Sequence, residues 1–284
     1  MQKVAPATIS KSPRAGDSHE VAAGHRNCGF VSIDGLDLGA SMIGIVIPAH
    51  NEASRLARCL AAAVAAARHP ALAREAVRIV VVLDSCRDAS ARIAARYPVE
   101  VLGVEARKVG VARATGAAHL LRLGARWLAF TDADSRVAPD WLAMQLSLGA
   151  DAVCGTVAVD DWRGHPACVR EHWRRAYRDV DGHRHVHGAN LGVSARAYRR
   201  AGGFPPLACG EDVMLVDLLA ATGATIAWSA APRVRTSARA DPRVRGGFGD
   251  TLETWARVDG AAVAPGLPLA PAVADSGDAA PELR

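Results

Sequence analysis

Two aspartates near the middle of the chain, Asp132 and Asp134, could bind a divalent cation. They follow an apolar run and are two positions apart, so in extended backbone both carboxylates point to one side while Ala133 points away. Paired carboxylates hold Mg²⁺ or Mn²⁺ against the phosphates of nucleotide substrates. A lone pair of this kind also caps turns and helices, so at this point both interpretations stay open.

Polar residues also follow two earlier apolar runs, at residues 43–47 and 77–83. His50, Asn51 and Glu52 follow the first run after Pro48 and Ala49, and Asp84 follows the second. Ligands of open α/β sheets bind at the carboxyl ends of strands. We therefore expect these two segments to meet the Asp132 segment at one edge of a sheet.

The common nucleotide-binding signatures are missing from the sequence. No G-x-G-x-x-G follows the first apolar run, and no G-x-x-x-x-G-K-[ST] occurs. Phosphate groups would then be neutralised by a metal ion and by cationic side chains instead of glycine amides. The candidate cations are Lys108, Arg113, Arg233, Arg235 and Arg239.

A regular alternation of strand and helix patterns, beginning at Met42, positions these residues. The predicted strands are 43–47, 77–83, 99–104, 127–131, 152–159, 188–193 and 225–229. The predicted helices are 53–67, 89–96, 109–123, 140–148, 166–179, 195–201 and 212–222. We expect an α/β fold in which a mostly parallel, Rossmann-like sheet is flanked by helices.

The motifs together resemble the family 2 glycosyltransferases, which have the GT-A fold. The likeness runs from about residue 42 to 239, and it is carried by the segments 45–52, 82–85, 130–134 and 210–212. It implies an inverting hexosyltransferase that uses Mn²⁺ or Mg²⁺ and a nucleotide-sugar donor of the UDP or GDP type. The hydroxyl acceptor is not identified by the resemblance.

The resemblance also implies roles for individual residues. Asp134 is the main metal ligand, assisted by Asp132, and Asp212 is the general base beside Glu211. The donor-binding residues are Pro48, Ala49, His50, Glu52, Asp84, Lys108, Arg113, Asp132 and Ala133. The residues on the sugar and acceptor side are His187, Gly188 and Asn190.

Two features depart from parts of the family. The Q-x-x-R-W motif of processive members is absent, which favours transfer of a single sugar. Some GT-A enzymes add a downstream histidine to the metal site, and here no histidine follows His187. The alternating histidines 183, 185 and 187 are interpreted as a loop-borne surface cluster in preference to metal ligands. Residues 234–239 with 246–249 suggest a basic, glycine-hinged loop that closes over the diphosphate, or a plain surface connection.

The composition, 50% hydrophobic and 22% charged over 284 residues, predicts a globular protein. The longest apolar helical run, residues 59–67, is far shorter than the roughly 20 residues of a membrane span. No secretory signal is recognised, so we expect a cytoplasmic protein. The net charge of +5 comes mostly from arginine, and nucleic-acid binding is not expected. Peripheral membrane contact is expected only for a lipid acceptor.

Three regions are expected along the chain. Residues 1–41 form a loose extension, with Met42 as a candidate native start; 42–257 form the GT-A domain; 258–284 form a disordered tail rich in Ala and Pro. Two rival functions remain at this stage. A sugar-nucleotide pyrophosphorylase would begin with a glycine- and arginine-rich loop, which residues 48–52 are not. A catalytically silent nucleotide-sugar-binding module would not need Asp84, Asp132, Asp134 and Asp212 together.

Overall fold

The computed structural model describes residues 41–162, 164–207 and 209–238. The predicted extension, the tail and the 246–249 hinge lie outside the described residues. None of the described helices is both long and apolar enough to cross a membrane.

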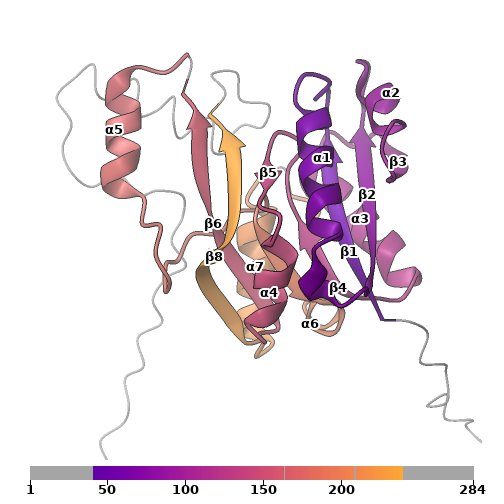
Figure 1. Cartoon of the computed structure of the whole chain (residues 1–284). Helices are drawn as coiled ribbons and strands as arrows, with labels where there is room; N and C mark the ends of the chain where they lie inside the picture. Colours follow the sequence, from indigo (N-terminus) through magenta and orange to yellow (C-terminus); the bar gives the residue numbers. More distant parts are fainter. Residues whose placement is uncertain (1–40, 163, 208, 239–284) are drawn as a thin grey trace, which may run out of the picture. The chain divides into compact units, whose positions relative to one another are not determined.

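An eight-stranded sheet forms the centre of the fold, in the order β3-β2-β1-β4-β7-β6-β8-β5 (Figure 1). The strands are β1 Met42–Ala49, β2 Ala76–Asp84, β3 Glu100–Val104, β4 Ala125–Phe130, β5 Arg136–Val137, β6 Ala152–Asp161, β7 Leu191–Ser194 and β8 Ile226–Ser237. β3, β2, β1 and β4 are parallel, β7 is antiparallel to both neighbours, and β8 is parallel to β6 and antiparallel to β5. Four of the seven strand pairs are therefore parallel, and the predicted α/β class is confirmed.

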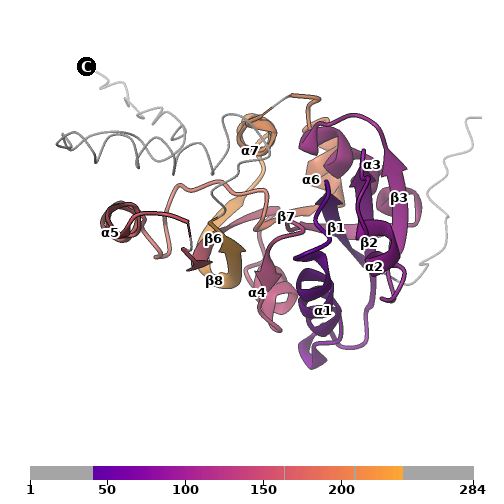
Figure 2. The same cartoon turned by 90° about the horizontal axis from the view of Figure 1, so that it is seen from above.

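Helices cover both faces of the sheet. They are α1 Leu56–Ala67, α2 Ser90–Ala94, α3 Val109–Arg122, α4 Trp141–Ser147, α5 Ala167–Ala176, α6 Ala195–Arg200 and α7 Glu211–Ala221, with a short 3₁₀ turn at Pro70–Leu72. Figure 2 shows α1 and α4 on one side of the sheet and α3, α6 and α7 on the other.

The alternation of β1 explains the two covered faces. Ile43, Ile45 and Ile47 belong to the core under α1 and α4, whereas Met42 and Val46 belong to the core under α3, α6 and α7. A strand buried on both faces reads as a continuous apolar run, which is the pattern that predicts it.

α3 lies very close to β1 because glycines stand at the contact. A Cβ atom at Gly44 would lie 2.6 Å from Leu120 Cδ1, and one at Gly116 would lie 2.6 Å from Val46 Cγ1. The close approach fixes where the first turn of α3 meets the end of β1.

One prediction about the end of the described chain is wrong. Residues 234–237 are not a loop but the last part of β8, where Val234 pairs with Val137 of β5 and with Val157 of β6. Val234 and Thr236 are buried and Arg235 is exposed, which is the alternation of a half-buried strand. The arginines obscured that alternation in the sequence.

Candidate active site

The carboxyl ends of β2, β1 and β4 lie side by side, because these three parallel strands are neighbours in the sheet. Asp84 is the last residue of β2, Pro48 and Ala49 are the last residues of β1, and Asp132 follows β4 by two positions. The segments expected to meet at one edge do so.

Asp84 holds the loop before α3. Its Oδ1 accepts hydrogen bonds from the amides of Ala106 and Arg107 at 2.9 and 2.8 Å, and its Oδ2 accepts one from Lys108 at 2.9 Å. Burial raises the pKa of Asp84, but these amides, led by Arg107, outweigh burial, and the pKa lies below its ordinary value. The ionised carboxylate therefore fixes the loop that enters α3.

The β1–α1 segment is fastened to β2. Pro48 and Ala49 are buried at the end of β1, so they offer a ligand mainly backbone atoms. His50 Nδ1 lies 2.6 Å from the carbonyl oxygen of Asp84. The amide of Glu52, which is also buried, donates to Ser90 Oγ at 3.0 Å.

Three left-handed residues occur in the loops after β1, β2 and β3, and only Asn51 among them is of a residue type that favours this conformation. Asn51, Ser85 and Arg107 have φ angles of 53°, 52° and 50°. Non-glycine residues adopt this conformation rarely, and such residues cluster at functional sites. Each is held by hydrogen bonds: Arg87 N donates to Asn51 Oδ1 at 2.8 Å, Ser85 N donates to Val104 O at 2.8 Å, and Arg107 N donates to Asp84.

A buried arginine joins three elements of the candidate site. Arg113 of α3, only 3% exposed, donates to Asp132 Oδ1 at 2.6 Å and to Glu211 Oε1 at the start of α7. Burial lowers the pKa of Arg113, but the carboxylates of Asp132, Glu211 and Asp212 raise it by more than burial lowers it. The pKa therefore lies above its ordinary value, and the guanidinium stays charged. We call Arg113, Asp132 and Glu211 the Arg113 network.

The carboxylates of the Arg113 network have raised pKa values. Burial raises the pKa of Asp132 more than Arg113 lowers it, and Asp134 adds to the rise. Burial likewise raises the pKa of Glu211, and Asp212 adds to the rise. One guanidinium is thus shared among several carboxylates, and the side chain of Asp132 remains 34% exposed toward a ligand.

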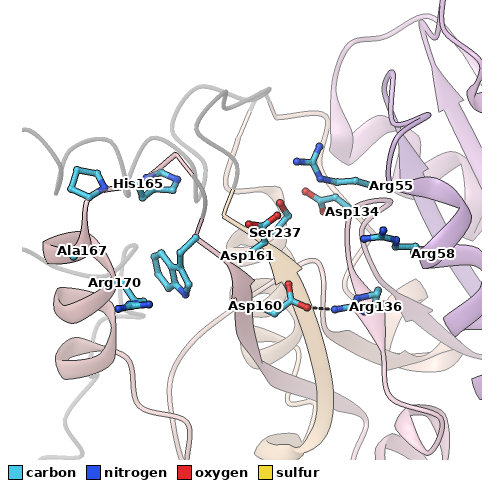
Figure 3. Close-up of a pocket in the computed structure, with 12 residues that line it drawn as sticks. Arg55, Arg58, Asp134, Arg136, Asp160, Asp161, His165, Ala167, Arg170 and Ser237 are labelled. Atoms are coloured by element: carbon cyan, nitrogen blue, oxygen red, sulfur yellow. Dashed lines mark hydrogen bonds and ion pairs between the residues drawn. The ribbon is translucent and has the colours of Figure 1, made fainter.

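Asp134 lies on the other side of the Asp132–Asp134 turn. It lines a pocket of about 740 Å³ between α1, β5, the end of β6 and the segment that leads into α5 (Figure 3). Ala133 between the two aspartates is buried in the core, so it offers mainly backbone atoms. The segment is a turn and not the extended backbone that was predicted, so the expectation that both carboxylates point to one side is wrong: Asp132 faces Arg113, whereas Asp134 lines this pocket.

The residues present fit a Mg²⁺ or Mn²⁺ ion bound in part by substrate. Within the described residues no group of three or more His, Cys, Asp or Glu side chains could hold a metal ion. Asp132 and Asp134 nevertheless supply carboxylate oxygens, and Mg²⁺ is commonly bound by one or two carboxylates together with substrate phosphates. A complete metal site would therefore need oxygen ligands from the substrate.

Asp212 is tied to the turn that precedes β7. Its Oδ2 accepts a hydrogen bond from the Gly188 amide at 2.7 Å, and its Oδ1 accepts one from the Val213 amide at 2.9 Å. A Cβ atom at Gly188 would lie 2.3 Å from Arg113 Nη2, so a larger residue at this position would collide with the Arg113 network. Gly188 therefore places the Asp212 carboxylate next to that network.

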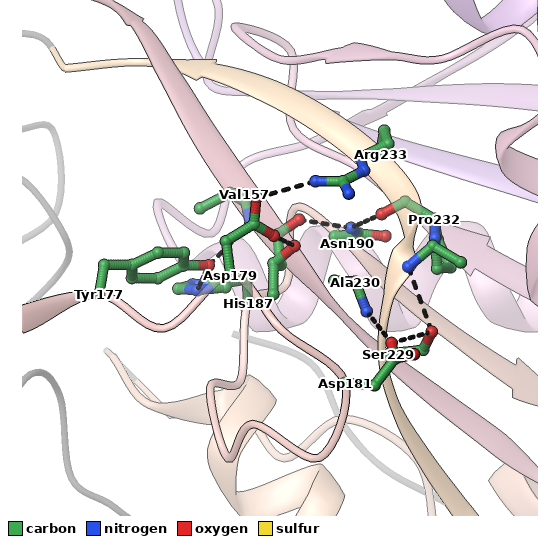
Figure 4. A network of polar contacts seen from close by, with 12 residues as sticks. Val157, Tyr177, Asp179, Asp181, His187, Asn190, Ser229, Ala230, Pro232 and Arg233 are labelled. Carbon is green, nitrogen blue, oxygen red and sulfur yellow. Dashed lines mark hydrogen bonds and ion pairs between the residues drawn. The ribbon is translucent and has the colours of Figure 1, made fainter. Parts of the chain in front are cut away.

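Asn190 is completely buried, and its side chain forms hydrogen bonds with other residues of the protein. Its Nδ2 donates to the carbonyl oxygens of Thr156 at 2.7 Å and Pro232 at 2.8 Å (Figure 4). Its Oδ1 accepts from Trp141 Nε1 at 2.8 Å. A contact between Asn190 and a sugar stays a prediction; in this structure the residue joins β6, β8 and α4 to the turn.

The histidines at 183, 185 and 187 lie on a loop, as predicted, and form a stack, but they are not a surface cluster, because His183 is buried and His185 and His187 are half-buried. His183 is 2% exposed, and the ring centroids of His185 lie 5.4 Å from His183 and 4.2 Å from Tyr177. Burial, and then His185 and His183, lower the pKa of His187 to about 3. The Nε2 atom of the neutral His187 ring can therefore accept a hydrogen bond from the Tyr177 hydroxyl, whose oxygen lies 3.0 Å away.

Two of the cations predicted to meet the phosphates have protein partners in this structure, and their contact with a phosphate stays a prediction. Arg233 pairs with Asp179 at 2.8 Å, and Lys108 Nζ lies 3.5 Å from the carbonyl oxygen of Pro206. Arg235 faces outward on β8, and Arg239 lies outside the described residues. The arginines that line the pocket with Asp134 are instead Arg55, Arg58, Arg136 and Arg170.

Comparison with known proteins gives a family and a fold. Residues 44–201 match the model of the family described as "Glycosyl transferase family 2". Among solved structures, S. aureus TarS in complex with UDP-GlcNAc is similar, with a TM-score of 0.55 and 14% identity over 73% of this chain and 61% of that chain. No curated protein matches the sequence significantly.

Two further structures have the same fold. A mannosyltransferase from Pyrobaculum calidifontis in complex with GDP-Man and Mn²⁺ has a TM-score of 0.52 and 18% identity over 72% of this chain and 58% of that chain. GalNAc-T7 with UDP, GalNAc and Mn²⁺ has a TM-score of 0.53 and 17% identity over 73% and 47%. The chain thus spans less than two thirds of the length of these proteins, and the likeness shows the GT-A fold.

Proposed function

Because the chain belongs to glycosyl transferase family 2, we propose that it transfers a single sugar from a nucleotide-sugar donor to a hydroxyl acceptor, with inversion. The observation that carries the proposal is the Arg113 network, which joins the donor-side Asp132 to Glu211, the neighbour of Asp212. The complexes of similar proteins with UDP-GlcNAc and GDP-Man support a donor of the UDP or GDP type.

In this proposal the donor lies along the carboxyl ends of β2, β1 and β4. The base and ribose bind beside Asp84 and the 48–52 segment, and the diphosphate reaches Asp132 and Asp134. A divalent cation bound there would neutralise the diphosphate as it leaves. The Mn²⁺ in two of the similar structures supports a metal ion at this position.

Asp212 acts as the general base. Its carboxylate takes the proton of the acceptor hydroxyl while the hydroxyl oxygen attacks the anomeric carbon, and the bond from that carbon to the diphosphate oxygen breaks with its electron pair leaving on the diphosphate. The Gly188 amide orients the carboxylate. Glu211, predicted to be catalytic beside Asp212, is proposed here as a positioning residue because Arg113 engages its carboxylate.

Nucleotide binding and turnover test these roles. Two assays need no known acceptor: titration of UDP and GDP with and without Mn²⁺, and hydrolysis of the matching sugar donors, in which water takes the place of the acceptor hydroxyl and the nucleoside diphosphate is released. Asp212→Asn should keep the nucleotide Kd within about twofold and slow release by roughly 10²–10⁴-fold. Asp134→Asn should weaken the Mn²⁺-dependent part of nucleotide binding by about tenfold or more.

Asp217→Asn, on the same helix α7, is the matched control and should behave like the wild type. Turnover by Asp212→Asn at the wild-type rate would remove the general base from the proposal. Wild-type protein that binds a nucleotide sugar tightly but transfers its sugar neither to water nor to any hydroxyl compound supplied with it would instead be a silent binding module. No binding of any nucleotide would contradict the proposal as a whole.

A further inference from the structure

The pocket beside Asp134 contains more cationic groups than the protein itself pairs. Arg136 is ion-paired with Asp160 across the pocket. Arg55, Arg58 and Arg170 line the same pocket, and among residues 41–162, 164–207 and 209–238 none of the three has an ion-pair partner. Figure 3 shows Arg55 and Arg58 on one side of the pocket and Arg170 on the other. We call Arg55, Arg58 and Arg170 the arginine triad.

The triad is assembled by tertiary structure. Arg55 and Arg58 stand at the start of α1, whereas Arg170 stands on α5, far along the chain. Isolated exposed arginines are ordinary on a surface, but here the four arginines that line one pocket outnumber its three aspartates, Asp134, Asp160 and Asp161, so the pocket has a net positive charge. A guanidinium binds phosphate or carboxylate through two parallel hydrogen bonds, which makes arginine suited to oxyanions.

The position of the pocket relative to the proposed donor site indicates whose anion it would bind. In the sheet order β2-β1-β4-β7-β6-β8-β5, Asp84 lies on β2, and Asp134 follows β4. Most of the lining comes from β5, the ends of β6 and β8 and the segment that leads into α5, which lie beyond Asp134 from Asp84 in the strand order, while Arg55 and Arg58 come from the start of α1. The base and ribose of a donor held at β1 and β2 would not occupy it.

We infer that the arginine triad binds a phosphate-class oxyanion carried by the acceptor, so that the acceptor is an anionic hydroxyl compound. This inference rests on the proposed function, since only a bound donor makes the far side of Asp134 the acceptor side. Asp212 does not line the pocket, so the anion is a part of the acceptor remote from the reacting hydroxyl. Trp162, which also lines the pocket, provides an apolar wall for the connecting atoms.

Direct titration separates this site from the donor site. Glycerol 3-phosphate is the anionic probe, glycerol is its neutral counterpart, and UDP and GDP with Mn²⁺ report on the donor site. Arg55→Gln/Arg58→Gln should weaken glycerol 3-phosphate binding by about tenfold or more, because two charge-assisted contacts are lost. Arg170→Gln removes one contact from another element and should weaken binding less. UDP and GDP affinities should change by less than about twofold.

Arg92→Gln/Arg96→Gln, on α2 and just after its end, is the matched control, since it removes the same charge from exposed positions outside the pocket. It should bind glycerol 3-phosphate like the wild type, and wild-type binding should weaken as ionic strength rises. Equal glycerol 3-phosphate binding by the triad variants and the wild type, or none by the wild type, would overturn the inference.

Two other outcomes identify the anion's source. If UDP and GDP binding falls in parallel with glycerol 3-phosphate binding, the triad serves the donor diphosphate, and the assignment to the acceptor is overturned. If no nucleotide binds to the wild type while the triad variants still lose glycerol 3-phosphate, the proposed function fails, and with it the acceptor assignment, although the anion site itself remains. The two failures are therefore distinguishable.

Discussion

The turn from Asp132 to Asp134 separates two clusters of charge that differ in almost every physical respect. On one side Arg113 is buried and donates to two carboxylates of the protein. On the other side Arg58 and Arg170 are exposed and have no ion-pair partner within the described residues. A buried charge must be paired by the protein, whereas an exposed one is solvated by water until a ligand replaces it.

The difference shows which arginines hold the site together and which are available to a ligand. Arg113 was a candidate for phosphate binding in the sequence, yet its donors are used by Asp132 and Glu211. The arginine triad carried no motif, yet its guanidinium groups face a pocket. Family motifs therefore identify the internal framework of the site more readily than its variable ligand contacts.

Of the substitutions considered, removal of the buried arginine should reduce the free energy of unfolding most. Arg113→Met should lower the free energy of unfolding by about 3–5 kcal/mol, because Asp132 and Glu211 would be left without their cation. Urea denaturation measures the loss. Arg122→Met, at an exposed position of the same helix, should cost less than about 0.5 kcal/mol. A loss below about 1 kcal/mol in Arg113→Met would contradict the framework role of the network.

Acid should also lower the free energy of unfolding, because His187 is neutral in the folded protein. The folded-state pKa of His187 is about 3, whereas an unfolded chain binds this proton near the ordinary pKa of 6.5. The stability due to neutral His187 is therefore complete above pH 6.5 and is lost as pH falls from 6.5 toward 3. Between pH 7 and pH 5 the expected loss is about 2 kcal/mol.

Denaturation of His187→Gln at both pH values measures that contribution. The variant should lose correspondingly less stability between pH 7 and pH 5 than the wild type does. Part of the pH dependence should remain, because burial also lowers the pKa values of His183 and His185. The same slope in the variant and the wild type would show that His187 is not the titrating group.

The smallest effect is expected on the exposed side. The Arg136–Asp160 pair spans the pocket with side-chain exposures of 46% and 28%. Arg136→Gln should change the free energy of unfolding by less than about 1 kcal/mol, because an exposed ion pair gains little over solvation. A double-mutant cycle with Asp160→Asn isolates the pair, and a coupling above about 2 kcal/mol would mean that the pocket is part of the framework.

The sequence predicted the strands and the shared edge well, because both follow from local pattern. Apolar runs give buried strands, and polar residues that follow them give the edge where Asp84 and Asp132 meet. Burial of Asn190 and convergence of the arginine triad depend instead on contacts between distant segments. No spacing rule reports such contacts, so neither the internal hydrogen bonds of Asn190 nor the shared pocket of the triad can be predicted from the sequence.

The three backbone amides that donate to Asp84 order the site before a ligand binds. Asp84 holds residues 106–108, α3 begins directly after them, and Arg113 stands only one helical turn further on. Residues 106–108 and the first turn of α3 therefore connect the end of β2 to Arg113, which in turn binds Glu211 beside Asp212. These groups are already ordered before any ligand binds, so their conformational entropy is lost during folding. Less of the binding free energy of a donor is then needed to order them.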